Sequence, residues 1–339
     1  MWLIFDTMGK GRHLIIMQHE ANSDSAGQGA TPPEGGVIPG GQGPAFVLSG
    51  SQLSSLPVLI AAPHGGRCYP PELLARMRHP EQAALRLEDR LVDLLGESVA
   101  EATGTRLLVA RAPRAMIDLN RHPEDVDWDM LGLAEPSGLS LRSNARARSG
   151  LGLVPRRLPG MGEIWRGRLT RSELEARIEG VHKPYHAALA QELAAIRARW
   201  GAVLLIDLHS MPSLPTEGGE AAAQIVLGDR FGSTCHGQVV AAAFAQFAAT
   251  GWRAAHNRPY AGGYVLDRHA MQRHGFHAMQ LEIDRADYLD SRLVDPGAGF
   301  AATVEMLAGL VRRLGEEVAR LGAQRRTGPW RGHWADAAE

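Results

Sequence analysis

Short apolar runs alternate with amphipathic segments along most of the chain. The runs that have the length of a strand and are apolar almost throughout are residues 58–62, 106–110, 203–208, 224–227 and 278–283. Uninterrupted apolar strands are typical of a sheet whose two faces are both covered. The pattern therefore predicts an α/β fold in which helices flank a layered sheet.

Two stretches have the period of an amphipathic helix. Residues 170–201 begin with Thr170 and Glu173, the pattern of a capping box, and carry an apolar stripe. We expect Pro184 to kink this helix. Residues 81–102 are predicted to form one further helix, with leucines along one side. The polar side of that helix carries Arg86, Asp89, Arg90 and Asp93.

Three stretches do not fit the alternating pattern. Residues 21–44 are rich in small residues and proline and nearly free of large apolar side chains, so we expect a flexible leader at 1–44. A single folded domain is predicted over residues 45–325, followed by a C-terminal tail at 326–339. Within the domain, residues 127–168 lack periodicity and are rich in arginine, which predicts an irregular insert that is functional or disordered.

Charge and cysteine content narrow the classes of function. The chain has 37 acidic and 36 basic residues, so nothing favours nucleic acid or an anionic membrane as partner, and a small molecule fits better. Cys68 and Cys235 are too few for a disulfide framework, which indicates a reducing compartment. No apolar run approaches the roughly 20 residues that span a bilayer. We therefore expect a soluble, cytoplasmic protein, whose oligomeric state the sequence leaves open.

Two histidines follow or end predicted strands. His64 comes directly after residues 58–62, and His209 stands at the end of the third apolar run, on the same side as Asp207. In an α/β fold such positions open into the ligand crevice. Imidazoles are the commonest protein ligands of zinc, and a catalytic zinc site takes three protein ligands and a water. Each histidine is also consistent with a structural role inside the fold.

A carboxylate and several arginines stand at further strand positions. Glu282 interrupts the apolar run 278–283, which is costly unless the carboxylate is paired or used. Asn120, Arg121 and Arg114 follow the run 106–110, and arginine binds carboxylates with two parallel hydrogen bonds. A core glutamate in an ion pair and a surface turn closed by arginines are the alternatives.

The motifs that contain these residues occur in a fixed order between about residue 57 and about residue 290. They are PHGGRCYP, LEDRLVDLL, APRAMIDLNRHPED, VHKPYHAAL, LLIDLHSMPS, IVLGDRFG, PYAGGY and MQLEIDR. Together they resemble the N-formylglutamate amidohydrolase family, which is similar to the zinc carboxypeptidases. The resemblance implies a mixed, mostly parallel sheet with the phosphorylase/hydrolase-like architecture of the zinc exopeptidases. It also implies zinc-dependent hydrolysis of an N-acyl amino acid, with N-formyl-L-glutamate giving L-glutamate and formate.

The resemblance assigns roles to individual residues. Carboxypeptidases have a glutamate ligand three residues after their first histidine, but that position is Arg67 here, so another residue must be the third ligand. Asp89 fits the family pattern D-x-x-V-D and is chosen, with Glu88 and Glu72 as alternatives. The predicted metal ligands are thus His64, Asp89 and His209. Glu282 is the predicted proton shuttle and Arg121 a catalytic arginine. The predicted substrate contacts are Asn120, Arg114, His186, Tyr264 and Arg268.

A second histidine pair offers a rival metal site. His182 and His186 are four residues apart on the predicted helix 170–201, a spacing that can grip an ion. No carboxylate motif accompanies them, so we expect His186 near the substrate and His182 at the surface. Of the remaining histidines, His269 is the best candidate for a substrate contact.

Other classes of function stay open at this point. A carboxypeptidase-like peptidase would act on blocked dipeptides, and a non-catalytic binding protein for an acidic metabolite would need no zinc with an open coordination position. A serine hydrolase is disfavoured because the chain has no G-x-S-x-G motif.

Overall fold

The computed structural model describes residues 35–134, 145–216 and 221–327. Most of the predicted leader (1–34), part of the predicted insert (135–144) and most of the predicted tail (328–339) lie outside the described residues.

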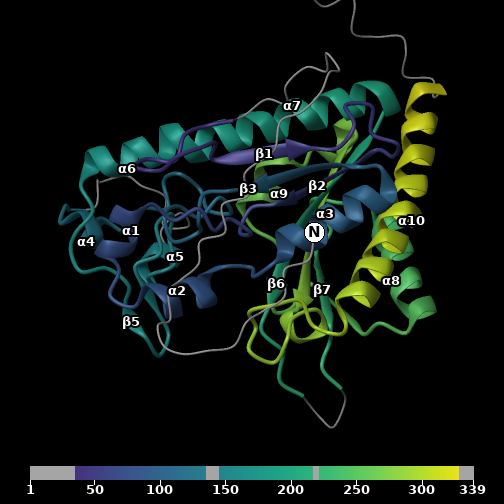
Figure 1. Cartoon of the computed structure of the whole chain (residues 1–339). Coiled ribbons are helices and arrows are strands. Elements are labelled where there is room, and N and C mark those ends of the chain that lie inside the picture. The colour runs from purple at the N-terminus through teal and green to yellow at the C-terminus, as the bar shows by residue number, and fades with distance from the viewer. Residues whose placement is uncertain (1–34, 135–144, 217–220, 328–339) are drawn as a thin grey trace, which may run out of the picture. The chain divides into compact units, whose positions relative to one another are not determined.

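A seven-stranded sheet runs through the domain in the order β1-β3-β2-β6-β9-β7-β8 (Figure 1). Neighbouring strands are parallel from β3 to β9, whereas β1 and β7 are antiparallel to the strands that they join to this centre. The strands are β1 (Phe46–Ser49), β2 (Val58–Ala62), β3 (Arg106–Ala110), β6 (Val203–Met211), β7 (Ile225–Gly228), β8 (Ala254–His256) and β9 (Phe276–Asp284). The predicted α/β fold with a mixed, mostly parallel sheet is confirmed.

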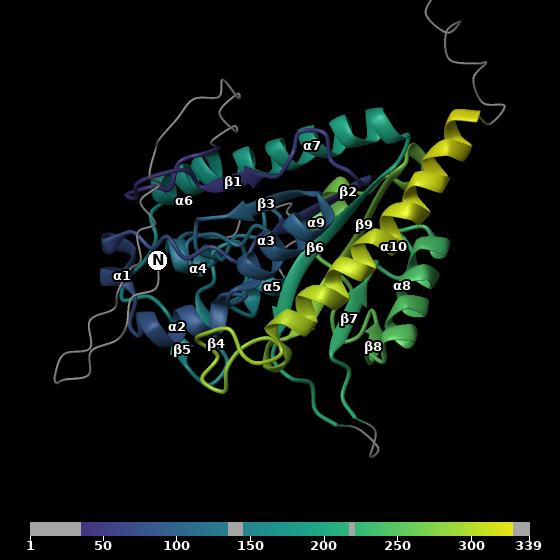
Figure 2. The same ribbon diagram turned by 45° about the vertical axis from the view of Figure 1, so that its right-hand side comes forward.

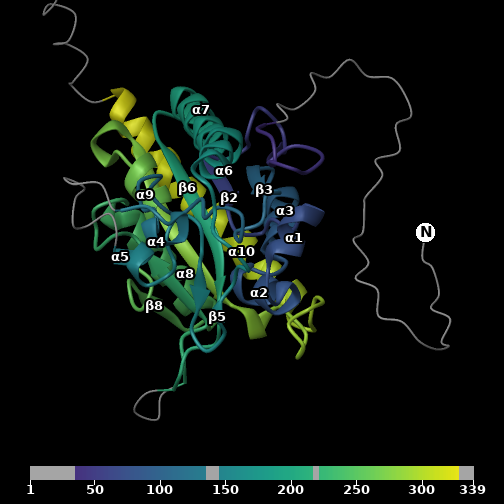
Figure 3. The ribbon, with the colours of Figure 1, turned by 90° about the vertical axis from the view of Figure 1, so that its left-hand side faces the viewer.

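Alternate residues of the central strands face two separate cores. In β2, Leu59 and Ala61 pack with α7 and α9, whereas Val58 and Ile60 pack with α3, α8 and α10. Figure 2 and Figure 3 show α7 and α10 passing the central strands on opposite sides. Because both faces are covered, β2, β3 and β6 are buried at every residue, which explains their uninterrupted apolar sequences.

The larger helices form the two outer layers, and the smaller elements connect them. The helices are α1 (Pro71–Arg76), α2 (Pro80–Leu87), α3 (Val92–Thr103), α4 (Trp128–Leu131), α5 (Ala145–Arg148), α6 (Arg171–Arg177), α7 (Lys183–Trp200), α8 (Gly237–Thr250), α9 (Tyr264–His269) and α10 (Phe300–Thr327). A small second sheet pairs β4 (Arg157–Leu158) with β5 (Gly162–Glu163) inside the predicted insert. Among the residues that the structure describes, no helix is both long and apolar enough to cross a membrane.

The predicted helix 170–201 forms, with an irregularity that its proline explains. Thr170 and Glu173 make the predicted capping box, and a π-helical turn at Ile178–His182 joins α6 to α7. Pro184 has no N–H to donate to the carbonyl four residues earlier, that of Gly180. The carbonyl of Gly180 instead accepts the N–H of Val37 at 2.8 Å.

This contact corrects the predicted leader. Residues 35–44 pack on the domain: the side chain of Ile38 is 1% exposed, and Gly35 bridges to Phe46. A side chain on Gly180 would meet the carbonyl oxygen of Val37 at 2.6 Å, so this close approach requires glycine. The ordered domain therefore begins before residue 45.

The predicted helix 81–102 is wrong, because two helices occupy this stretch. α2 ends at Leu87 and α3 begins at Val92. Leu91, at the start of α3, has a left-handed backbone with φ of 57°, which a continuous helix cannot contain. Asp89 lies in the break, where its N–H donates to the carbonyl of His64 at 3.1 Å.

Candidate metal centre

The site lies at the carboxyl end of the central parallel strands. In the register of β6 and β9, His209 pairs with Glu282 and Asp207 pairs with Gln280. β2 lies on the other side of β6, and His64 follows two residues after its end. Strand order and register therefore bring residues from distant parts of the sequence to one edge of the sheet.

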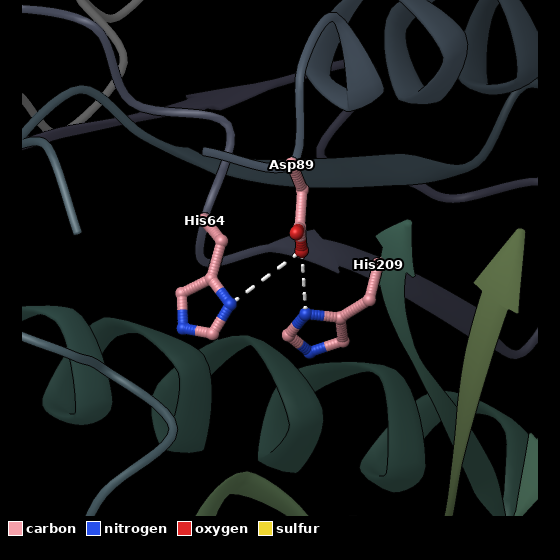
Figure 4. Close-up of side chains that lie close together, drawn as sticks. All are labelled: His64, Asp89 and His209. Atoms are coloured by element: carbon pink, nitrogen blue, oxygen red, sulfur yellow. Dashed lines mark hydrogen bonds and ion pairs between the residues drawn. The ribbon is translucent and has the colours of Figure 1, made fainter. Parts of the chain in front are cut away.

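His64, Asp89 and His209 converge at this edge (Figure 4). One oxygen of Asp89, Oδ2, lies 2.8 Å from Nδ1 of His209 and 3.5 Å from Nδ1 of His64. Ligand atoms of the three side chains all lie within 4.8 Å of one another, and all three residues are buried. Within the described ranges, no other group of three or more histidines, cysteines and carboxylates is arranged in this way.

Each histidine is oriented by a second carboxylate. Nε2 of His64 lies 2.7 Å from Oδ1 of Asp118, and Nε2 of His209 lies 2.9 Å from Oδ2 of Asp207. Carboxylates at these positions favour the tautomer with a proton on Nε2, which leaves Nδ1 to bind a metal. Nδ1 of His64 is buried and has no hydrogen-bond partner among the described residues. The donor set and this unpaired nitrogen fit a zinc ion.

Arg285 holds the other oxygen of Asp89. Its Nη2 lies 3.4 Å from Asp89 Oδ1 and donates to the carbonyl of Glu88 at 2.7 Å, while its Nε donates to Oγ of Ser210 at 3.1 Å. Burial alone would raise the pKa of Asp89, but the neighbouring imidazoles of His209 and His64 hold it well below its usual value. Asp89 is therefore an ionised carboxylate. The sequence prediction did not include Arg285.

Asp118 is a second residue that the prediction missed, although it stands inside the quoted motif DLNR. Its Oδ2 accepts Nε of Arg114 at 2.9 Å, and its Oδ1 accepts the backbone N–H of Asn120 at 2.8 Å as well as His64. Burial would raise the pKa of Asp118, but the charges of Arg114, His64 and Arg121 hold it well below its usual value. The carboxylate thus orients a ligand histidine and a buried arginine together.

Glu282 lies beside His209 across the strand pair and is 8% exposed. Its Oε1 accepts Nε2 of Gln280 at 2.8 Å. Burial raises the pKa of Glu282 to about 7, against the opposing charge of His209. A carboxyl group with such a pKa can both accept and return a proton near neutral pH.

The side chains of Asn120 and Arg121 form hydrogen bonds with other residues of the protein. Nε of Arg121 donates to the carbonyl of Leu151 at 2.9 Å, and its Nη1 donates to the carbonyl of Asn120 at 3.0 Å. The side chain of Asn120 accepts the N–H of Val265 and donates to Gln280. Arg121 therefore fastens the predicted insert to the motif DLNR.

The rival histidine pair forms a buried cluster with His269. Nε2 of His182 lies 3.0 Å from the carbonyl of Arg121 and Nε2 of His186 lies 3.0 Å from that of Leu119, so both nitrogens donate. Nδ1 of His186 then accepts from Nε2 of His269 at 3.0 Å. Burial lowers the pKa of His182 to about 4, that of His269 to about 3 and that of His186 well below its usual value.

These contacts correct the expectation for His182. It is 2% exposed, so its predicted surface position is wrong. His186 is fully buried, and its two ring nitrogens bond to Leu119 and His269. Neither His182 nor His186 belongs to the metal group found among the described residues.

The remaining predicted residues make other contacts or are exposed. Tyr264 packs edge-on against the ring of His186, and its hydroxyl accepts Nη1 of the exposed Arg268 at 2.9 Å. Of the two alternative ligands, Glu72 is exposed on α1, and Glu88 pairs with Arg90 at 2.9 Å.

Comparison with known proteins places the chain in a family. A family model described as N-formylglutamate amidohydrolase matches residues 56–289. An N-formylglutamate deformylase of Pseudomonas aeruginosa is 28% identical over 277 residues, which cover 80% of this chain and 95% of that protein. A crystal structure of N-formylglutamate amidohydrolase from Ralstonia eutropha JMP134 is 31% identical, with a TM-score of 0.73, and covers 81% of this chain and 99% of the other. The chain belongs to the N-formylglutamate amidohydrolase family.

Proposed function

We propose that this protein is a zinc-dependent amidohydrolase that converts N-formyl-L-glutamate to L-glutamate and formate. The observation that carries the proposal is the buried group of His64, Asp89 and His209 beside Glu282, whose pKa is raised to about 7. The names of the related proteins support the substrate. Cys68 and Cys235 are free thiols, which fits the cytoplasm as the place of reaction.

In this proposal, the metal would be held by Nδ1 of His64, Nδ1 of His209 and a carboxylate oxygen of Asp89. A zinc ion at this position supplies Lewis-acid chemistry and activates water for attack on an amide. Asp118 and Asp207 keep the two imidazoles in the tautomer that this requires, and Arg285 keeps Asp89 in place.

The proton is moved by Glu282. Its Oε1 is occupied by Gln280, so we assign Oε2 as the atom that takes the proton from the attacking water and returns it to the leaving nitrogen. Arg114 lies close enough for its charge to act on both Asp89 and Glu282, and we assign it to the oxyanion. Tyr264 and Arg268 are the proposed contacts to the substrate at the rim.

The decisive experiment is to measure formate release and zinc content for Glu282→Gln. The amide keeps the size of the side chain but cannot accept a proton, so kcat should fall by about 100-fold or more while zinc stays bound. Glu317→Gln, a buried glutamate on α10, is the matched control and should leave both quantities unchanged. Near-normal turnover of Glu282→Gln would contradict the proposed base, and loss of its zinc would make Glu282 a ligand.

The ligand set is tested separately through His64→Ala and His209→Ala. Each change removes one of three proposed ligands, so each variant should lose its zinc and its activity with little change in fold. His277→Ala, a buried histidine 4% exposed, serves as the control that keeps zinc. Full zinc occupancy in the first two variants would show that these imidazoles are not ligands. A wild-type protein that binds zinc but releases formate from no N-formyl amino acid would overturn the proposed reaction.

A further inference from the structure

We propose that Asn120 and Gln280 are positioning residues that form a one-directional hydrogen-bond relay from Val265 to Glu282. The inference rests on the proposed function, because it takes Glu282 as the base. It accounts for Asn120, Gln280 and Glu282 in the motifs DLNR and MQLEIDR and for Gly263 in PYAGGY.

The direction of the relay follows from its first donor. The backbone N–H of Val265 can only donate, and it lies 3.0 Å from Oδ1 of Asn120. The Nδ2 group of Asn120 must then donate to Oε1 of Gln280, at 3.2 Å. The Nε2 group of Gln280 must in turn donate to Oε1 of Glu282, at 2.8 Å. Neither amide can be flipped without placing two donors or two acceptors face to face.

Burial makes the relay costly to break. Gln280 is 4% exposed, Asn120 is 6% exposed and Glu282 is 8% exposed, so water replaces a lost partner poorly. A chain of hydrogen bonds in such surroundings also polarises its members in one sense. The relay therefore delivers a firmly held N–H to one oxygen of the base.

Gly263 allows the first link to form. A Cβ atom at this position would meet Oδ1 of Asn120 at 2.4 Å and its Cγ at 2.7 Å. The loop can approach Asn120 this closely only without a side chain. The relay thus requires glycine at position 263. No other contact of the proposed site explains a glycine there.

Asn120 also joins the relay to the proposed metal ligands. Its backbone N–H donates to Oδ1 of Asp118 at 2.8 Å, and the same oxygen lies 2.7 Å from Nε2 of His64. One residue therefore sets the positions of a ligand and of the base. The consequence for the base is orientation: with Oε1 fixed by Gln280, Glu282 presents Oε2 in one direction.

The test is Gln280→Met, which keeps the length of the side chain but has no N–H. We expect kcat to fall by about 10- to 100-fold, the range typical of lost supporting hydrogen bonds. KM should change less than about threefold and zinc content should not change, because neither the ligands nor the substrate contacts are altered. Met279→Leu changes the residue before Gln280, on the opposite face of β9, and is the matched control, which should retain full kcat.

A double variant separates positioning from general damage. If Gln280 acts through Glu282, adding Gln280→Met to Glu282→Gln should lower kcat by less than about twofold further. Independent losses that multiply would overturn the relay. Gly263→Ala supplies a second route, since it displaces Asn120 and leaves Gln280 intact, and it should lower kcat with zinc retained.

The outcomes distinguish the two proposals. Wild-type kcat for Gln280→Met, with the large loss for Glu282→Gln intact, would remove the relay and leave the proposed function standing. Near-normal turnover of Glu282→Gln would remove the proposed function. Should Gln280→Met fail to fold, wild-type kcat for Gly263→Ala would overturn the relay on its own.

Discussion

At the scale of single residues, Asp118 connects three groups around the candidate centre. Its two oxygens accept from His64, Arg114 and the backbone of Asn120. We predict that Asp118→Asn weakens zinc affinity by about 10- to 100-fold, because the imidazole of His64 loses the charge that makes it a better ligand.

Competition with a fluorescent chelator measures this affinity. Asp229→Asn is the control, because Asp229 is also buried and bonds Asn257 outside the site at 2.7 Å. Equal zinc affinity in Asp118→Asn and wild type would mean that the carboxylate serves only the loop.

The sequence could predict those site residues whose position in or after a strand is unusual for a polar side chain. His64 and His209 stand at strand ends and Glu282 interrupts an apolar strand, and the structure brings all three together. Asp118 and Arg285 stand inside the motifs DLNR and MQLEIDR, but a motif shows neither the burial of a charged residue nor its partner. For the same reason, the position of His186 on a helix did not show that both its ring nitrogens bond to other parts of the protein.

At the scale of elements, the pattern of apolar residues predicted the buried strands of the sheet but not its edge strands. The buried strands β2, β3, β6, β7 and β9 were predicted, whereas the edge strands β1 and β8, of four and three residues, were not. The break between α2 and α3 was missed because Leu87 and Leu91 keep the helical period across it. The break places the backbone of Asp89 in contact with His64, which periodicity does not show.

The capping box of α6 gives a prediction at this scale. Oγ1 of Thr170 accepts the N–H of Glu173 at 3.2 Å, and the carboxylate of Glu173 accepts the N–H of Thr170 at 2.7 Å. Thr170→Ala should lower the free energy of unfolding by about 1 kcal/mol, as measured by denaturant titration. Gln191→Ala, at an exposed position of α7, is the control. An unchanged free energy of unfolding for Thr170→Ala would mean that tertiary packing alone holds α6.

For the whole molecule, buried neutral histidines contribute to the loss of stability in acid. Burial lowers the pKa of His277 to about 4, whereas an unfolded histidine titrates near 6.5. Between these values the unfolded chain binds a proton that the folded chain does not, so stability falls as the pH falls from about 6.5 to about 4.

His277→Leu removes this proton from the balance while filling the same buried position. The pH slope of its unfolding free energy should be smaller than that of wild type by up to about 1.4 kcal/mol per pH unit in this window. Urea titrations at a series of pH values measure the slope. Parallel curves for the two proteins would show that His277 is protonated in the folded state or does not matter.

The order of the central strands has a consequence for the folding of the protein. His64 follows β2, Asp89 lies between α2 and α3, His209 is on β6 and Glu282 is on β9, so no fragment shorter than this span contains all four side chains. β6 and β9 each carry only part of the site. Their pairing in this register brings His209 and Glu282 together. In the proposed enzyme, binding of zinc and completion of the sheet would then be one event. During refolding or synthesis, zinc retention would therefore report when the central strands have aligned.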